Sequence, residues 1–145
     1  MGHRKTRRSA HPVKDRWLFG FFMLHLLATI LHYTDNILRL SEYPDLPTTT
    51  PASIAFFWFA TTPVGVVAYV LYRRSEDPLS YYLFYVYCLV DLVVLGHFLP
   101  SRMKAMTVPM NLKIHFFIVL EAATAVSLMV YVGFLHWRQH VGRDL

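Results

Sequence analysis

The fold is decided by long apolar stretches, the last of which reads LKIHFFIVLEAATAVSLMVYVGFLHW (residues 112–137). At about 1.5 Å per residue, a helix of about 20 residues crosses the ~30 Å of hydrocarbon in a bilayer. Three further stretches are similarly long and apolar, at residues 17–38, 52–72 and 79–99. They are apolar on nearly all sides, whereas the helices of a soluble bundle carry a polar stripe. The sequence therefore predicts four transmembrane helices.

The predicted fold class is all-α, a four-helix transmembrane bundle. Lipid offers no hydrogen-bond partners to exposed backbone, so closed helices rather than an open sheet must span the membrane. The composition agrees, with 55% hydrophobic and 16% charged residues. We expect one transmembrane domain (residues 17–137) between a basic tail (1–16) and a second tail (138–145), with short connections that make neighbouring helices antiparallel. Thr50 and Asn111 are the expected N-caps of the second and fourth helices.

The orientation follows from the basic residues, because cytoplasmic loops carry an excess of Lys and Arg. Ten of the fourteen Lys and Arg residues lie in the two tails and the second connection, and four lie on the other side of the membrane. Both termini should therefore be cytoplasmic, in an integral multi-pass membrane protein that belongs to the plasma membrane if the chain is bacterial. The net charge of +5 then reflects topology and attraction to anionic lipids, and no nucleic-acid partner is expected.

Polar residues at membrane depth are the best functional lead, because a charge near the bilayer centre costs at least about 2.5–3.5 kcal/mol on insertion scales. Each of the four predicted helices carries some of them. They are His25, His32, Asp35 and Asn36 in the first helix, Thr61 and Thr62 in the second, Asp91 and His97 in the third, and His115 and Glu121 in the fourth.

Depth and angular spacing predict two layers rather than one tight site. Asp91 and Glu121 lie close to the bilayer midplane, and His32 lies about 10 Å below the outer surface. His97 lies six residues after Asp91, about 120° around an α-helix, and the same spacing separates His115 from Glu121. We therefore expect a layer of carboxylates beneath a layer of histidines.

Two interpretations of these residues stay open at this point. In the first, the carboxyl groups hydrogen-bond across the bundle and only hold the helices together. In the second, they line a polar pocket in the outer half of the membrane and carry protons. The candidate catalytic residues are His32, Asp35, Asp91 and Glu121. The candidate ligand-binding residues are His25, Asn36, Thr61, Thr62, His97 and His115.

Cofactor sites are weaker hypotheses. Haem would need two histidines on facing helices, as His32 with His97 or with His115 would supply. Copper(I) would suit histidine together with Met103, Met106 and Met110 of the connection before the fourth helix. Nothing in the sequence demands either group, and the paired Glu-x-x-His motifs of di-iron bundles are absent. The prediction is therefore a protein without a metal site or cofactor.

The chain resembles the EXPERA group of small membrane proteins, which includes sterol Δ8-Δ7 isomerase and the sigma-2 receptor. The likeness rests on His25, Asp35, the following Glu42-Tyr43-Pro44 and Pro63. The sigma-2 type has a pocket acid in its second helix, where this chain has Thr61 and Thr62. Other features resemble small bacterial four-helix membrane proteins, a likeness that implies no activity: His32-x-x-Asp35-Asn36, Gly96-His97 and Glu121.

The resemblance to the EXPERA group implies a mechanism. A sterol-like or isoprenoid lipid would enter between helices, an acid would protonate a C=C bond, and a base would remove a proton from the adjacent carbon. Glu121 or Asp91 would be the deep acid, with His32 as its partner. The expected partner is thus a membrane lipid or small hydrophobic ligand. A non-catalytic accessory subunit of a membrane complex is the alternative, and a homodimer or larger assembly is compatible with both.

Overall fold

The computed structural model describes residues 14–43, 48–75, 78–101 and 111–141. Its main elements are the helices α1 (Lys14–Leu38), α2 (Pro51–Ser75), α3 (Pro78–Asp91) and α5 (Leu112–Val141) and the 3₁₀ segments η1 (Leu40–Glu42) and η2 (Leu92–Phe98). Because η2 continues α3 directly, the two together form the third membrane-length helix. These ranges contain no strand and four helices long and apolar enough to cross a membrane, which confirms the predicted fold class.

Several sequence predictions fall outside the described residues. They concern most of the two tails (1–13 and 142–145) and the methionines Met103, Met106 and Met110. The helices themselves begin and end within a few residues of the expected limits. The largest difference is at α5, which continues past Trp137 to Val141.

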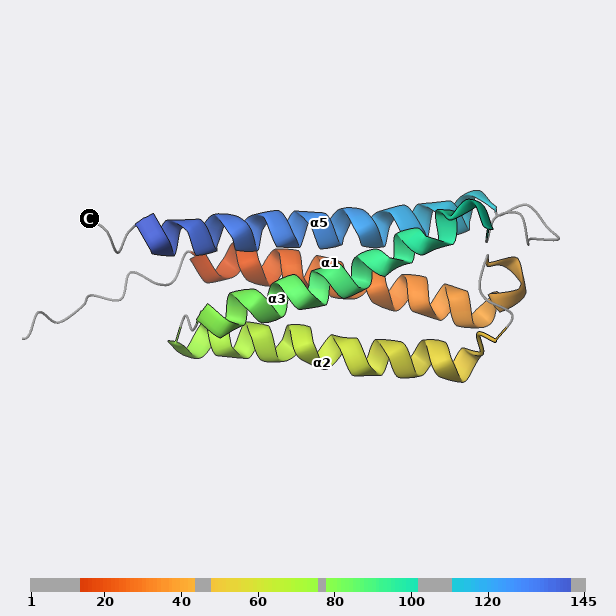
Figure 1. Cartoon of the computed structure of the whole chain (residues 1–145), viewed down its shortest axis with the longest axis horizontal. Coiled ribbons are helices and arrows are strands. Elements are labelled where there is room, and N and C mark those ends of the chain that lie inside the picture. Colours follow the sequence, from red (N-terminus) through yellow and green to blue (C-terminus); the bar gives the residue numbers. More distant parts are fainter. Residues whose placement is uncertain (1–13, 44–47, 76–77, 102–110, 142–145) are drawn as a thin grey trace, which may run out of the picture.

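The third helix crosses the bundle diagonally (Figure 1). α3 begins beside α2, and its continuation η2 packs on α5. α1 packs along both α2 and α5. We call the end of the bundle where α1 and η2 end and α2 and α5 begin the η2 end, and the opposite end the terminal end. The diagonal course of α3 leaves α2 and η2 apart at the η2 end.

Two helix starts carry the predicted caps. The backbone N–H of Ser53 donates to Oγ1 of Thr50 (3.1 Å), and the N–H of Thr50 donates to Oγ of Ser53 (2.9 Å). At α5, the N–H of Ile114 donates to Oδ1 of Asn111 (3.0 Å). Side-chain oxygens thus satisfy N–H groups that the first helical turn leaves without backbone partners.

The interior changes character along the bundle axis. Towards the terminal end it is a continuous cluster of apolar and aromatic side chains: Leu18, Phe22, Ala68, Tyr72, Tyr81, Phe84, Tyr87, Cys88, Ala125, Leu128, Val132 and Leu135. Towards the η2 end the buried side chains include His25, His32, Asp91, His97 and Glu121. The polar interior is therefore separated from the terminal end by apolar packing.

Gly65 supports this interior by letting α2 approach Tyr87. A Cβ atom at Gly65 would lie 2.7 Å from the Tyr87 ring and 3.0 Å from Phe22, whereas one at Gly20 would meet nothing within 4 Å. We expect Gly65→Ala to destabilise the bundle by about 1–3 kcal/mol through overpacking. Gly20→Ala should be neutral or slightly stabilising, since alanine is the better helix former.

Titration of purified protein with SDS in mixed micelles, followed by helicity, measures both unfolding free energies. Equal changes for the two glycines would contradict the assigned packing of Gly65.

Candidate functional site

The deepest polar contact joins three helices through His25. Nε2 of His25 in α1 lies 2.8 Å from Oδ2 of Asp91, the last residue of α3. Its Nδ1 lies 3.0 Å from Oγ1 of Thr124 in α5. His25 is completely buried and Asp91 nearly so. Both ring nitrogens of His25 are thus used, and the group ties α1, α3 and α5 together.

The other hydrogen bonds of Thr124 show which atom is the donor in its hydrogen bond with His25. Its hydroxyl lies 2.9 Å from the backbone carbonyls of Leu120 and Glu121, which only accept. The hydroxyl proton is used there, so Nδ1 of His25 donates to Oγ1. One proton then lies between Nε2 of His25 and Asp91, either in an imidazolium–carboxylate pair or in a neutral imidazole–carboxylic acid pair. The Oδ2 atom of Asp91 is thus already engaged in this contact.

Glu121 is in the opposite situation. Its side chain is 0% exposed, and neither carboxyl oxygen has a hydrogen-bond partner in the described part of the chain. The nearest basic atom is Nδ1 of His32, at 3.9 Å from Oε2, which is too long for a hydrogen bond. That nitrogen also lacks a hydrogen-bond partner among the residues that the structure describes. A buried polar group left unsatisfied costs about 1–3 kcal/mol, so these atoms are ready to take a proton, a water or a ligand.

His32 also belongs to a cluster of three rings. The ring centroids of His32, His97 and Tyr43 are each 5.6 Å from the other two. Tyr43 follows η1 and is buried, and its hydroxyl donates to Oδ2 of Asp35 (3.1 Å). Tyr43 therefore covers the two histidines from the η2 end. It belongs to the Glu42-Tyr43-Pro44 segment noted in the sequence.

Asp35 is the centre of an ionic network that fastens this cover. Nζ of Lys113 in α5 lies 2.7 Å from Oδ1 of Asp35, and Nε of Arg39 lies 3.5 Å from the same oxygen. Arg39 also pairs with Glu42 (3.7 Å), which accepts from Nδ2 of Asn111 (2.8 Å). Asp35, a candidate catalytic residue by sequence, is thus occupied in joining the end of α1 to the start of α5.

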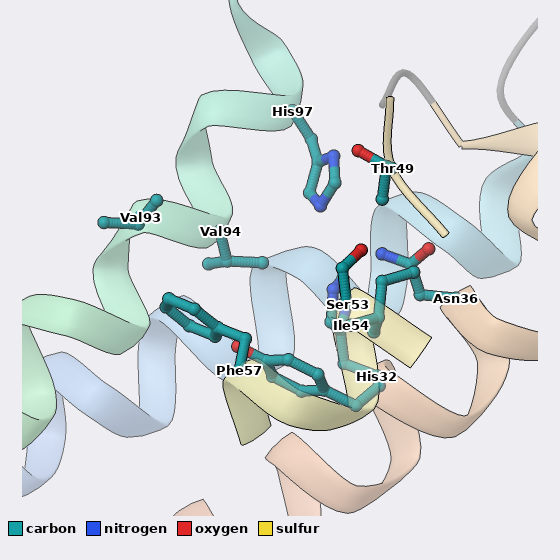
Figure 2. Close-up of a pocket in the computed structure, with 10 residues that line it drawn as sticks. His32, Asn36, Thr49, Ser53, Ile54, Phe57, Val93, Val94 and His97 are labelled. Atoms are coloured by element: carbon teal, nitrogen blue, oxygen red, sulfur yellow. The ribbon is translucent and has the colours of Figure 1, made fainter. Parts of the chain in front are cut away.

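A pocket of about 200 Å³ lies beside the three rings (Figure 2). It is formed by α1, the start of α2 and η2. Its described lining residues are His32, Tyr33, Asn36, Thr49, Ser53, Ile54, Phe57, Val93, Val94 and His97. Figure 2 shows Thr49, Asn36 and His97 on one side and Phe57, Val93 and Val94 on the other. The pocket therefore has a polar side and an apolar side.

The apolar side of the pocket opens towards the lipid-facing surface. Val93 is 64% exposed and Phe57 is also exposed, and in a membrane such side chains face hydrocarbon. The pocket is lined by residues of α2 and η2, the two segments that the diagonal course of α3 leaves apart (Figure 1). Tyr43 and the Asp35 network lie at the η2 end.

His97 reaches the pocket because η2 is a 3₁₀ helix. On an α-helix, six residues would place it about 120° away from Asp91. A 3₁₀ helix has 3.0 residues per turn, so a residue six positions on returns to the same side. Asp91 and His97 are accordingly both buried. The expected angular separation of this pair is wrong for this physical reason.

The other pair keeps α-helical geometry. Glu121 points into the bundle, whereas Nδ1 of His115 lies 3.0 Å from the backbone oxygen of Asn111 and its ring packs on Phe98. His115 does not line the pocket with His32 and His97. Each deep carboxyl group has a histidine of α1 as its neighbour, His25 for Asp91 and His32 for Glu121.

Thr61 and Thr62 lie away from the pocket as well. Oγ1 of Thr61 donates to the backbone oxygens of Phe57 (3.1 Å) and Trp58 (3.3 Å) of its own helix. Oγ1 of Thr62 is buried without a partner in the described residues. Neither hydroxyl lines the pocket.

Neither cofactor hypothesis gains support from the geometry. The His32 and His97 rings are in direct contact, and a pocket of about 200 Å³ is smaller than the ~300–1,000 Å³ of sites for drug-sized molecules. The residues present therefore do not fit a haem between them. In the described ranges, no three His, Cys, Asp or Glu side chains are grouped to hold a metal ion.

Sequence reasoning missed Thr124, Ser53 and Thr49. Thr124 was accessible in principle, because it lies three residues after Glu121 and so shares its face of α5. Thr49 and Ser53 lie at or before the start of α2 and meet the pocket only through the packing of α2 against α1. No spacing in the sequence indicates that.

Comparisons with known proteins add no identity to this geometry. The chain matches no protein family, and no curated protein or solved structure is similar to it at a significant level. The resemblance to the EXPERA group therefore stays a prediction. The chain is established as a four-helix protein with membrane-length helices and buried His, Asp and Glu side chains.

Proposed function

We propose that the protein binds one end of a hydrophobic, lipid-like molecule in the pocket beside His32. The observation that carries the proposal is a polar-sided cavity that opens between α2 and η2 towards lipid-facing side chains. The distribution of basic residues supports an orientation with the η2 end outside, so the molecule would come from the outer leaflet. If the polar residues only held the helices together, there would be no reason for such a cavity.

The size of the pocket supports binding of only part of the ligand. Sites that enclose most of a drug-sized molecule measure about 300–1,000 Å³, whereas this pocket measures about 200 Å³. The remainder of a sterol-like or isoprenoid molecule would extend past Val93 and Phe57 into the bilayer. In the bilayer, the apolar part of the molecule stays away from water, as it does before binding, so its burial in the protein is not needed.

Acid–base chemistry at this site is a second proposal, favoured by the unpartnered carboxyl group of Glu121. His32 contacts the pocket on one side and faces Glu121 on the other. We infer that a protonated His32 adds its proton to one carbon of a C=C bond, which leaves a cation on the other carbon of that bond. The next carbon beyond the cation then loses a proton to His97, and the electron pair of its broken C–H bond forms the shifted double bond. Transfer of that proton back to His32 restores the site, so the isomerisation needs no co-reactant.

In this reaction, Glu121 would supply and stabilise the proton on His32 without contacting the lipid, and is a positioning residue. Asp91 has no part in it, because its oxygen is hydrogen-bonded to His25. Asp35 would only hold Tyr43 in place over the two histidines, by accepting the hydrogen bond of the Tyr43 hydroxyl. This differs from the roles that the resemblance implied for Asp91 and Asp35.

A pair of matched valines tests the binding proposal. Val93→Phe should narrow the pocket opening, and Val86→Phe, on a lipid-facing surface of α3 that is 50% exposed, should leave it unchanged. Overfilling a packed site costs about 1–3 kcal/mol, so the Val93 variant should retain about tenfold less bound lipid. Mass spectrometry of lipids extracted from protein purified in mild detergent gives the amounts.

The alternative of a non-catalytic accessory subunit leads to a different result. It predicts that neither variant changes the amount of lipid and that no particular lipid is enriched over the surrounding membrane. Equal losses in both valine variants would likewise argue against the pocket as the binding site.

A further inference from the structure

We infer that the head of the bound molecule is neutral and carries a hydrogen-bond donor, as a hydroxyl group does, and that lipids with a phosphate head are rejected. This inference rests on the proposed function and names the chemical class of its ligand.

The first argument is the charge of the lining. Among the described residues that line the pocket there is no Lys, Arg, Asp or Glu; its polar groups are two imidazoles, one amide and hydroxyls. Phosphate groups in proteins are bound by Arg and Lys side chains or by helix N-termini. A neutral hydroxyl both donates and accepts, which matches imidazole and amide groups that do the same. The positive charge that the proposed isomerisation places on His32 is balanced by Glu121, which faces the same ring, so it does not call for an anionic head.

The Lys and Arg side chains that the structure describes at the η2 end are already engaged. Lys113 and Arg39 are held by Asp35, at 2.7 and 3.5 Å, and Arg39 also meets Glu42. A phosphate entering the pocket would therefore have to compete with an existing ion pair. Taking a charge out of water without a partner costs far more than burying a hydroxyl.

The start of α2 borders the pocket but is closed to an anion by its cap. Pro51 has no N–H, and the N–H of Ser53 donates to Thr50. The N–H of Ile54 donates to the backbone oxygen of Thr50 (3.1 Å). The donors that make a helix N-terminus an anion site are thus largely satisfied within the helix.

Asn36 adds an observation that points to a donor on the ligand. Its Oδ1 atom is buried and has no hydrogen-bond partner in the described residues, and the side chain lines the pocket. Figure 2 shows the amide nitrogen of Asn36 on the side of Ser53 and Ile54 and the oxygen on the far side. An amide group rotates to present either end, and an O–H group of the ligand pairs with the nitrogen as an acceptor or with the oxygen as a donor, whereas a fully ionised phosphate has no proton for the oxygen. Figure 2 shows Asn36 beside Thr49 and His97, on the side away from Val93 and Phe57. The head would lie there, with the apolar body towards the opening.

Two matched pairs of molecules test the inference on the whole protein in detergent micelles. Each pair keeps one apolar body and changes the head: geranylgeraniol with geranylgeranyl phosphate, and cholesterol with cholesterol sulfate. Affinities are measured by competition against a photoactivatable sterol probe. We expect each alcohol to bind at least about tenfold more tightly than its charged counterpart, because a buried charge without a partner is expensive.

The variant Asn36→Ala should weaken alcohol binding and reduce the difference within each pair. Thr34→Ala, at an exposed polar position two residues earlier in α1, is the control. It should change neither the affinity for the alcohols nor the difference in affinity within each pair. Equal or tighter binding of the charged molecules, or an unchanged preference in Asn36→Ala, would overturn the inference and leave the proposed function standing. If the probe and all four molecules fail to bind, the proposed function fails as well.

Discussion

Replacing Asp91 with leucine is expected to destabilise the bundle by about 3–5 kcal/mol, because it leaves His25 buried without its hydrogen-bonded partner. The contact joins α1 to the end of α3 at 2.8 Å, and both side chains are shielded from solvent. Thr124 holds the other ring nitrogen, so His25 has no second position in which to recover the loss. The unfolding free energy in SDS-containing mixed micelles measures the effect.

The double variant His25→Leu/Asp91→Leu is the control for this prediction. When both side chains are removed, neither leaves the other buried without its hydrogen-bond partner. The unfolding free energy of the double variant should therefore fall by much less than the sum of the two single decreases. Additive losses, or a negligible effect of Asp91→Leu alone, would contradict the assignment of this contact as the polar clamp of the bundle.

Glu121 is expected to behave in the opposite way. Glu121→Met should raise the unfolding free energy by about 1–3 kcal/mol, because methionine fills a similar space and removes a buried carboxyl group that has no hydrogen-bond partner in the described residues. The same change should lower the proposed isomerisation by about 10²–10⁴-fold, the usual size of a lost acid–base contribution. A gain in stability with a loss of activity is the signature of a residue retained for function.

Activity can be measured before the natural lipid is identified. Protonation at carbon in D₂O adds deuterium to the bound lipid, and mass spectrometry detects the added mass. Glu121→Gln, which keeps the shape of the side chain, should also suppress deuterium uptake. A structural role for Glu121 would instead appear as a loss of stability in the methionine variant, with deuterium uptake unchanged per folded molecule.

Asp91 and Glu121 show how much of a site can be predicted from each helix taken alone. Both were predicted to lie deep, since depth follows from the rise per residue along a helix, and both are buried. Their partners depend on packing between helices. The histidines seven residues apart on α1 share one face, but only the placement of α3 and α5 decides that His25 meets Asp91 and His32 faces Glu121.

Other parts of the site were out of reach for a different reason. Asp35 was a candidate catalytic residue because it is a polar residue at membrane depth, yet Lys113, from a helix far along the chain, pairs with it. His97 was placed about 120° from Asp91 under the assumption of α-helical geometry. The apolar sequence of η2, which packs on α5, does not reveal the local change to 3₁₀ geometry.

The sequence by itself determined the number, length and class of the helices and two of their caps, because apolar length and capping chemistry are local properties of the chain. Tertiary structure alone decided which polar groups became partners and where a pocket formed. The physical reason is that the oblique crossing of α3 sets the distances between side chains on different helices. It also leaves α2 and η2 apart (Figure 1), the two segments that line the pocket together with His32 of α1.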